Sequence, residues 1–152
     1  MTRLQQLHAE QDQSPWLDNL PRQYLTDGTL ARLVASGIRG VTANPTILAK
    51  AIEGSDAYDA QFAQLIDAGR SVTDAYWELV IDDVIGALSV LRPTHDSSGG
   101  TDGFVSIEVA PELAYDTNAT IDAARQLHER IDQPTCTSRS PPPMKGCPPS
   151  PR

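Results

Sequence analysis

The stretch Gly40-Val41-Thr42-Ala43-Asn44-Pro45-Thr46-Ile47 decides the fold of this chain. A short β-prone run ends at Ala43, and Asn44-Pro45 follows before a helical pattern begins at Thr46. Proline disfavours the helical conformation of the residue before it, and it suits the first position of a helix. The stretch therefore predicts a strand that stops at Asn44, whose carboxamide lies at the C-terminal tip of the strand and beside a helix N-terminus.

Two other stretches repeat this arrangement. Trp16-Leu17-Asp18 precedes it in the chain, and Val105-Ser106-Ile107-Glu108-Val109 follows it. In α/β folds, ligands bind at the C-terminal ends of parallel strands. Three strand ends that carry Asp18, Asn44 and Glu108 therefore predict one polar site built from successive βα units.

Helical and strand-like patterns alternate along the chain. The predicted strands cover residues 14–18, 40–43 and 104–109. The predicted helices cover residues 2–13, 21–37 with a break at 27–28, 46–52, 55–69, 71–91 and 117–131. Such alternation predicts a parallel sheet with helical crossovers, either a (β/α) barrel or an open doubly wound sheet. The absence of a glycine-rich loop after any strand disfavours a nucleotide-binding fold.

Two details of the helices are specific enough to be tested. Arg92-Pro93 is expected to end the long helix at Leu91 and to leave residues 95–103 as a polar, glycine-rich turn, because proline breaks helix interiors. In the helix over residues 117–131, the apolar residues Ile121, Ala124 and Leu127 are expected to face the core.

Composition and charge narrow the function classes. At 152 residues the chain can hold one domain with a real core. The formal charge of −8 argues against a nucleic-acid-binding surface, which needs a basic face. No apolar run reaches membrane-spanning length, and residues 1–13 are polar rather than signal-like. We therefore expect a cytoplasmic protein that binds neither nucleic acid nor membranes.

The last eighteen residues differ in composition from the rest. Residues 135–152 hold both cysteines, six of the twelve prolines, three basic residues and no acidic one. Subtracting their charge of +3 from −8 leaves −11 for residues 1–134. We therefore divide the chain into a folded part over residues 1–134 and a Pro/Ser-rich, disordered tail over residues 135–152. Neither a metal site nor a disulfide is indicated for the two cysteines.

Four segments together resemble transaldolase, and more narrowly the form common in actinobacteria. They are Trp16-Leu17-Asp18-Asn19-Leu20, the stretch from Gly40 to Thr46, Ser55-Asp56-Ala57-Tyr58-Asp59, and Val105-Ser106-Ile107-Glu108-Val109. The resemblance covers roughly residues 4–134, in order and with family-like spacing. It implies a truncated (β/α)8 TIM barrel, with about the first three βα units plus an N-terminal helix.

The resemblance also implies an enzymatic function in the pentose phosphate pathway. Transaldolases transfer a dihydroxyacetone unit from sedoheptulose 7-phosphate to glyceraldehyde 3-phosphate through a Schiff base on a lysine of barrel strand four. The family needs no metal and no organic cofactor, and its partners are sugar phosphates. The oligomeric state is left open.

The resemblance assigns roles to four residues. It implies that Asp18 is the general acid/base for proton transfers at the substrate hydroxyl during carbon–carbon cleavage. It implies that Asn44 and Thr42 bind the substrate, with Asn44 hydrogen-bonded to the dihydroxyacetone unit. It implies that Glu108 activates a water for carbinolamine formation and Schiff-base hydrolysis. Such proton transfers require carboxylates within hydrogen-bond reach of the reacting atoms.

Each candidate also has a structural alternative. Asp18 can simply cap the turn after its strand, and Asn44 can be only a turn residue before proline. Glu108 can face solvent on a half-exposed strand, although a carboxylate within an apolar run is costly unless it is partnered or hydrated. The three together, at three successive strand ends, favour a site.

The strand-four lysine is missing from the expected place. A complete barrel needs about 250 residues, and the family has a run such as Asn-Leu-Tyr-Ile-Lys-Ile-Pro-Ala-Thr shortly after Pro134. Residues 135–143 instead are Thr-Cys-Thr-Ser-Arg-Ser-Pro-Pro-Pro. With suitable codons, one extra nucleotide before Thr135 makes the same bases encode the expected run, and the lysine codon then spans Ser138 and Arg139. We infer a one-nucleotide frameshift after Pro134 and expect the chain as written to be inactive.

Alternatives from other function classes stay open. A non-catalytic remnant of a transaldolase could act as an interaction module through an exposed edge strand. A metal-dependent barrel aldolase would need a His or carboxylate cluster, which the sequence lacks. The histidines His8, His95 and His128 lack catalytic spacing and are expected at the surface. The lysines Lys50 and Lys145 are not expected to replace the missing nucleophile.

Overall fold

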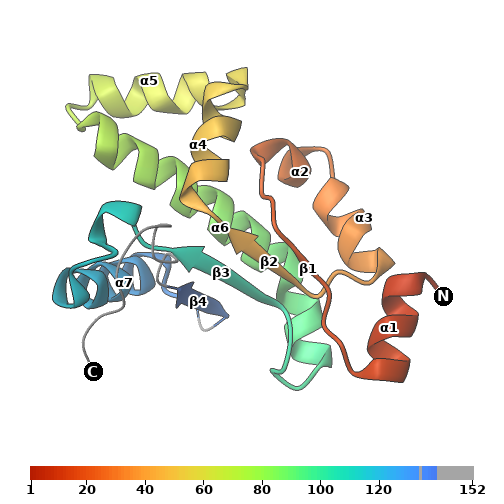
Figure 1. Ribbon diagram of the computed structural model, residues 1–152. Helices are drawn as coiled ribbons and strands as arrows, with labels where there is room; N and C mark the ends of the chain where they lie inside the picture. Colours follow the sequence, from red (N-terminus) through yellow and green to blue (C-terminus); the bar gives the residue numbers. More distant parts are fainter. Residues whose placement is uncertain (134, 140–152) are drawn as a thin grey trace.

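The computed structural model describes residues 1–133 and 135–139, and the strands within them form a parallel sheet (Figure 1). They are β1 (Trp16–Leu17), β2 (Gly40–Ala43), β3 (Phe104–Glu108) and β4 (Cys136–Arg139), side by side in this order. The α-helices are α1 (Arg3–Gln11), α2 (Arg22–Thr26), α3 (Thr29–Ser36), α4 (Pro45–Glu53), α5 (Asp59–Asp67), α6 (Val72–Ser97) and α7 (Thr117–Ile131), and short 3₁₀ helices are η1 (Asp56–Tyr58) and η2 (Pro111–Leu113). This α/β order, in which each strand pairs with the next one along the chain, is the order expected for the first strands of a (β/α) barrel.

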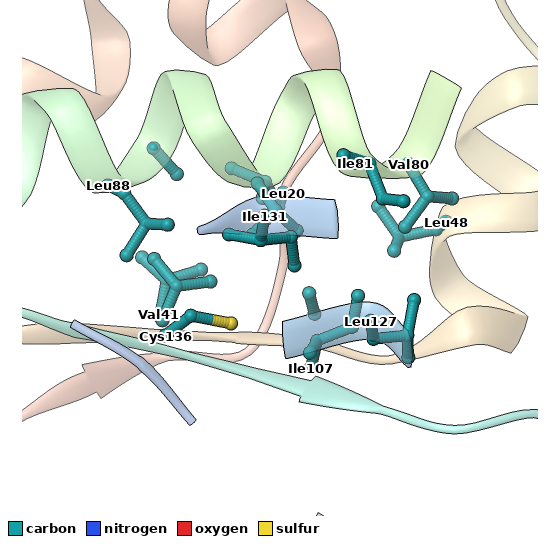
Figure 2. Close-up of a cluster of buried hydrophobic side chains, with 14 of the residues drawn as sticks. Leu20, Val41, Leu48, Val80, Ile81, Leu88, Ile107, Leu127, Ile131 and Cys136 are labelled. Carbon is teal, nitrogen blue, oxygen red and sulfur yellow. The ribbon is translucent and has the colours of Figure 1, made fainter. Parts of the chain in front are cut away.

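The core lies between one face of the sheet and the long helix α6 (Figure 2). Because side chains alternate across a strand, Val41 and Ala43 of β2 share this face with Val105 and Ile107 of β3. Helices α4, α6 and α7 cover the face with buried apolar side chains, among them Leu48, Val80, Ile81, Val84, Leu88, Leu91, Leu127 and Ile131. The opposite face of the sheet is therefore left for the polar residues of the strands.

Helix α6 continues through Pro93 to Ser97, so the expectation that it ends at Leu91 is wrong. A proline inside a helix removes one backbone hydrogen bond, but the turn after it is held by tertiary contacts. The ring of His95 packs edge-to-face on Phe104 of β3, with centroids 5.5 Å apart. Gly103, at φ +81°, lies so close to the His95 backbone that no side chain would fit there.

Among the described residues, no helix is both long and apolar enough to span a membrane.

Helix α7 buries Leu127 and half-buries Ala124, as expected, but Ile121 is 43% exposed. Ile121 lines an open groove of about 370 Å³ beside Ser138 of β4. The prediction that Ile121 faces the core is therefore wrong, because its side chain lines this open groove instead.

The first residues of the tail were expected to be disordered, but residues 136–139 form a strand. Residues 136–139 form β4, which pairs in parallel with β3, and the backbone N–H of Val105 donates to the Thr135 carbonyl at 3.2 Å. Cys136 is buried in the core, and this burial raises the pKa of its thiol to about 11. A strand edge offers unpaired backbone groups, so a following segment of modest β propensity can pair with it. Pro134 and residues 140–152 lie outside the described part, and the division of the chain at residue 134 stays a prediction.

A buried polar cluster joins α2, η1, α5 and α6. The Arg22 guanidinium donates to Asp83 through Nε at 2.7 Å and to Gln61 through Nη1 at 2.6 Å, and it stacks 4.3 Å from the centre of the Tyr58 ring. The Tyr58 hydroxyl donates to the other oxygen of Asp83 at 2.9 Å. Burial raises the pKa of Asp83, although its hydrogen bonds with Arg22 and Tyr58 oppose this shift. The cluster fixes α2, which follows the end of β1, against the helices behind the sheet.

A second polar cluster lies at the N-terminal ends of the strands. Asp102 accepts hydrogen bonds from Ser14, which precedes β1, and from Arg39, which precedes β2, with Nε of Arg39 at 2.6 Å. Burial alone raises the pKa of Asp102, but the hydrogen bonds from Ser14 and Arg39 outweigh it and hold the pKa below its usual value. The N-terminal ends of the strands thus carry structural polar contacts, which leaves the C-terminal ends for a site.

Candidate active site

The candidate residues lie at or near the C-terminal ends of β1, β2 and β3, three adjacent strands of the sheet. Asp18 directly follows β1, Asn44 directly follows β2, and Glu108 is the last residue of β3. Thr42 lies inside β2, on the face opposite to Val41 and the core. Because the strands are parallel and in sequence order, Asp18, Asn44 and Glu108 come to the same edge of the sheet, as the sequence predicted, and Thr42 lies two residues before Asn44.

Asn44 uses both ends of its carboxamide. Its Oδ1 accepts from the backbone N–H of Thr46 at 2.9 Å and of Ile47 at 3.4 Å, and therefore caps α4. Its Nδ2 donates to Oε2 of Glu108 at 3.3 Å. The alternative that Asn44 is only a turn residue is therefore incomplete, since the side chain that begins the helix also reaches the next strand.

Glu108 is only 5% exposed. The alternative of a solvent-facing residue on a half-exposed strand is therefore wrong. A buried carboxylate needs hydrogen-bond partners, and Asn44 supplies one of them. Glu108 is thus held at a fixed place at the edge of the sheet.

Asp18 is exposed and accepts a hydrogen bond from the hydroxyl of Thr42. This bond crosses from β2 to the residue after β1, so it ties the Asp18 carboxylate to the neighbouring strand. The Thr42 hydroxyl also lies 3.5 Å from the Leu17 carbonyl oxygen, at the limit of a hydrogen bond. Thr42 therefore orients Asp18 toward the same edge that carries Asn44 and Glu108.

Ser106 is a member of this polar face that the sequence analysis did not single out. It lies opposite Thr42 in the register and two residues before Glu108, so it faces the same side, and it is 8% exposed. The alternation of polar and apolar residues in Val-Ser-Ile-Glu-Val could have identified it. The polar face therefore carries hydroxyl groups from two strands beneath the carboxylates.

Strand β4 brings two further backbone positions beside the site. Ser138 pairs with Ile107, and Arg139 pairs with Glu108. Lys50 is exposed on α4, and Lys145 lies outside the described residues.

The histidines lie away from these strand ends. His128 is exposed on α7, as expected, whereas His8 and His95 are half-buried, so the surface expectation is only partly right. His8 contacts the Gln13 carbonyl oxygen at 3.2 Å, and His95 contacts Asp96 at 3.4 Å. These contacts tie both rings to nearby parts of their own chain segments.

Comparison with known proteins gives a consistent family. The model of the transaldolase/fructose-6-phosphate aldolase family matches residues 15–138. The chain belongs to this family. Its members are enzymes with a (β/α)8 barrel, which confirms the expected resemblance and fold class. The match favours an enzyme by descent over the alternative of an interaction module.

Curated transaldolases from bacteria are similar to the chain. A transaldolase of Thiobacillus denitrificans is 45% identical over 130 residues, which cover 85% of this chain and 36% of that protein. Transaldolase 1 of Streptomyces avermitilis is 42% identical over 141 residues, 92% of this chain and 37% of that protein. A transaldolase of Thermobifida fusca is 42% identical over 146 residues, 95% of this chain and 39% of that protein. The chain therefore spans little more than a third of the transaldolases that it matches.

Proposed function

We propose that this protein derives from a transaldolase of the pentose phosphate pathway. The proposed reaction moves a dihydroxyacetone unit from sedoheptulose 7-phosphate to glyceraldehyde 3-phosphate through a Schiff base on a strand-four lysine. The proposal includes sugar phosphates as substrates, no metal or organic cofactor, and the cytoplasmic location expected from the sequence. The observation that carries it is the arrangement of Asp18, Asn44 and Glu108 at three successive strand ends of a chain from this family.

The proposed roles follow from what each side chain can do at its place. Asp18, exposed and oriented by Thr42, is accessible for proton transfers at a substrate hydroxyl. Asn44 presents an amide beside Glu108, where it can hydrogen-bond the dihydroxyacetone unit. Glu108, buried and fixed, is suited to activate one bound water for carbinolamine formation and Schiff-base hydrolysis.

A Schiff base requires an amine that is held neutral near the substrate carbonyl. In our proposal this amine belongs to a strand-four lysine, which a one-nucleotide frameshift after Pro134 has replaced. The pairing of Arg139 with Glu108 supports the proposal, because a lysine at this backbone position would begin beside the carboxylate proposed to handle its water. The chain as written is then expected to be inactive.

Resequencing the gene around the codon for Pro134 tests the frameshift directly. The second test restores the reading frame after Pro134 in the complete gene and incubates the product with fructose 6-phosphate and borohydride. We expect a trapped covalent adduct that disappears when the restored strand-four lysine is replaced.

Lys50→Ala in the restored protein is the matched control, since Lys50 is an exposed lysine of α4. This variant should trap as much adduct as its parent. A reducible adduct on the 152-residue chain itself would contradict the proposal that the nucleophile is missing.

A further inference from the structure

Tyr76 of α6 lies between the two segments that follow Asn44 and Glu108. It lines a pocket of about 460 Å³ together with residues from the start of α4 and from the loop after β3. The other lining residues are Pro45, Thr46, Ala49, Thr73, Trp77, Ala110, Pro111 and Glu112. A side chain of the helix behind the sheet therefore reaches the point where two strand ends turn outward.

The Tyr76 hydroxyl donates to the carbonyl oxygen of Pro45 at 3.0 Å. Pro45 is the first residue of α4, and Asn44 caps this helix through hydrogen bonds from Thr46 and Ile47. The first turn of α4 is thus stabilised by two side chains: Tyr76 of α6 bonds the Pro45 carbonyl, and Asn44 caps the helix N-terminus. A shift of this turn would move the Asn44 side chain, and with it the 3.3 Å contact to Glu108.

We propose that Tyr76 is a positioning residue that holds Asn44 in the geometry required for its contact with Glu108. This inference rests on the proposed function only in treating Asn44 and Glu108 as site residues. Tyr76 does not touch the reacting atoms in this proposal, and it acts through the first turn of α4.

Two features make Tyr76 suited to this role. Its ring packs edge-to-face on Trp77, with centroids 5.4 Å apart and planes at 73°, so the direction of the hydroxyl is restrained. Burial raises the pKa of Tyr76 to about 12, and the charge of Glu112 adds to the shift. The hydroxyl therefore stays protonated, and able to donate its hydrogen bond, to a higher pH than the hydroxyl of an ordinary tyrosine.

The test compares Tyr76→Phe with Tyr58→Phe in the 152-residue chain. Both changes remove one hydrogen-bonded tyrosine hydroxyl and keep the ring, but the hydroxyl of Tyr58 bonds Asp83 rather than α4. We expect Tyr76→Phe to shift the NMR signals of the Asn44 side-chain amide. Hydrogen exchange at the amides of Thr46 and Ile47 should also become about five- to tenfold faster, as expected for the loss of one net hydrogen bond. Tyr58→Phe should leave the Asn44 signals in place.

Unchanged Asn44 signals in Tyr76→Phe, or equal shifts in both variants, would overturn the proposal. A measurement on the unsubstituted chain covers the case of a poorly folded variant. The Tyr76 hydroxyl proton should exchange slowly enough to be observed and should show a nuclear Overhauser effect to the first turn of α4. Failure to observe this effect would also overturn the proposal.

The two proposals can fail separately. If Tyr76→Phe shifts Asn44 but the frame-restored protein traps no adduct, the positioning role stands and the proposed function fails. If the adduct forms but Asn44 does not respond to Tyr76, the proposed function stands and the positioning role fails.

Discussion

Nδ2 of Asn44 lies 3.3 Å from Oε2 of Glu108, while Oδ1 of Asn44 caps α4. One carboxamide therefore connects the end of β2, the start of α4 and the end of β3. Substitutions of Asn44 can separate these contacts because they differ in chemistry. The cap needs only an acceptor, whereas the contact with Glu108 needs a donor.

Asn44→Asp should keep the cap and lose the contact with Glu108. It places a second carboxylate beside a buried one, and two like charges at this distance disfavour each other. We expect the free energy of unfolding at pH 7, measured with urea, to fall by about 1–3 kcal/mol. The loss should shrink as the pH is lowered and one carboxylate becomes protonated. Asn118→Asp, on the exposed first turn of α7, is the control and should have little effect.

Glu108→Gln tests the proposed water activation in the frame-restored protein. Glutamine keeps the size of the side chain but cannot accept a proton, and general acid–base groups typically contribute about 10²–10⁴-fold in rate. We expect transaldolase turnover to fall by a factor in this range while the protein stays folded by circular dichroism. Glu129→Gln, at an exposed position on α7, should retain full turnover. Equal turnover in both variants would contradict the role of Glu108.

Stability at alkaline pH should depend on two tyrosines. Burial raises the pKa of Tyr58 and of Tyr76 to about 12, from 10 for an ordinary tyrosine. Between these values the unfolded chain loses the tyrosine protons that the folded chain retains, so stability falls as the pH rises from 10 to about 12. Below pH 10 the two tyrosines contribute no pH dependence. Urea unfolding as a function of pH should show a shallower alkaline loss in Tyr58→Phe, and an unchanged slope would contradict this prediction.

Asp83→Ala should strongly destabilise the fold. The side chain of Asp83 is 3% exposed and pairs with Arg22 at 2.7 Å, so its removal leaves a largely buried guanidinium without this carboxylate. Breaking a buried ion pair by removing one partner typically costs about 3–5 kcal/mol. Asp96→Ala, which breaks the solvent-exposed pair between Asp96 and Arg92, should change the unfolding midpoint far less. Similar losses in the two variants would contradict the structural importance of the Arg22–Asp83 pair.

Leu91→Ala tests whether the core extends to the last turns of α6. Leu91 is fully buried, and truncation of a buried leucine to alanine typically costs about 2–5 kcal/mol. We expect a loss of this size in the free energy of unfolding. Leu7→Ala on α1 is the control, because Leu7 is 41% exposed and surface substitutions usually stay within about 0.5 kcal/mol. A Leu91→Ala variant as stable as the Leu7→Ala variant would show that α6 is not packed along its whole length.

Local patterns in the sequence were sufficient to predict the bounds of several helices and strands. The predicted strand over residues 40–43 and helix over residues 117–131 have these same bounds in the structure. The Asn44-Pro45 pair places the strand end and the helix start within one turn, so little tertiary information is needed there. The same reasoning placed Asp18, Asn44 and Glu108 at the C-terminal ends of successive strands, because parallel strands in sequence order bring such ends together.

Contacts between distant residues decided the rest. Pro93 predicts the end of a helix, but the packing of His95 on Phe104 holds a further turn in place. The composition of the tail predicts disorder, yet the open edge of β3 pairs with residues 136–139.

The hydrogen bond from Tyr76 to Pro45 joins residues 31 positions apart in the chain, and the contact from Asn44 to Glu108 joins residues 64 apart. Neither leaves a periodic pattern in the sequence. Helix ends and strand ends depend on neighbouring residues and can be inferred from them. A side-chain hydrogen bond depends on distance and angle, which only the packed chain determines.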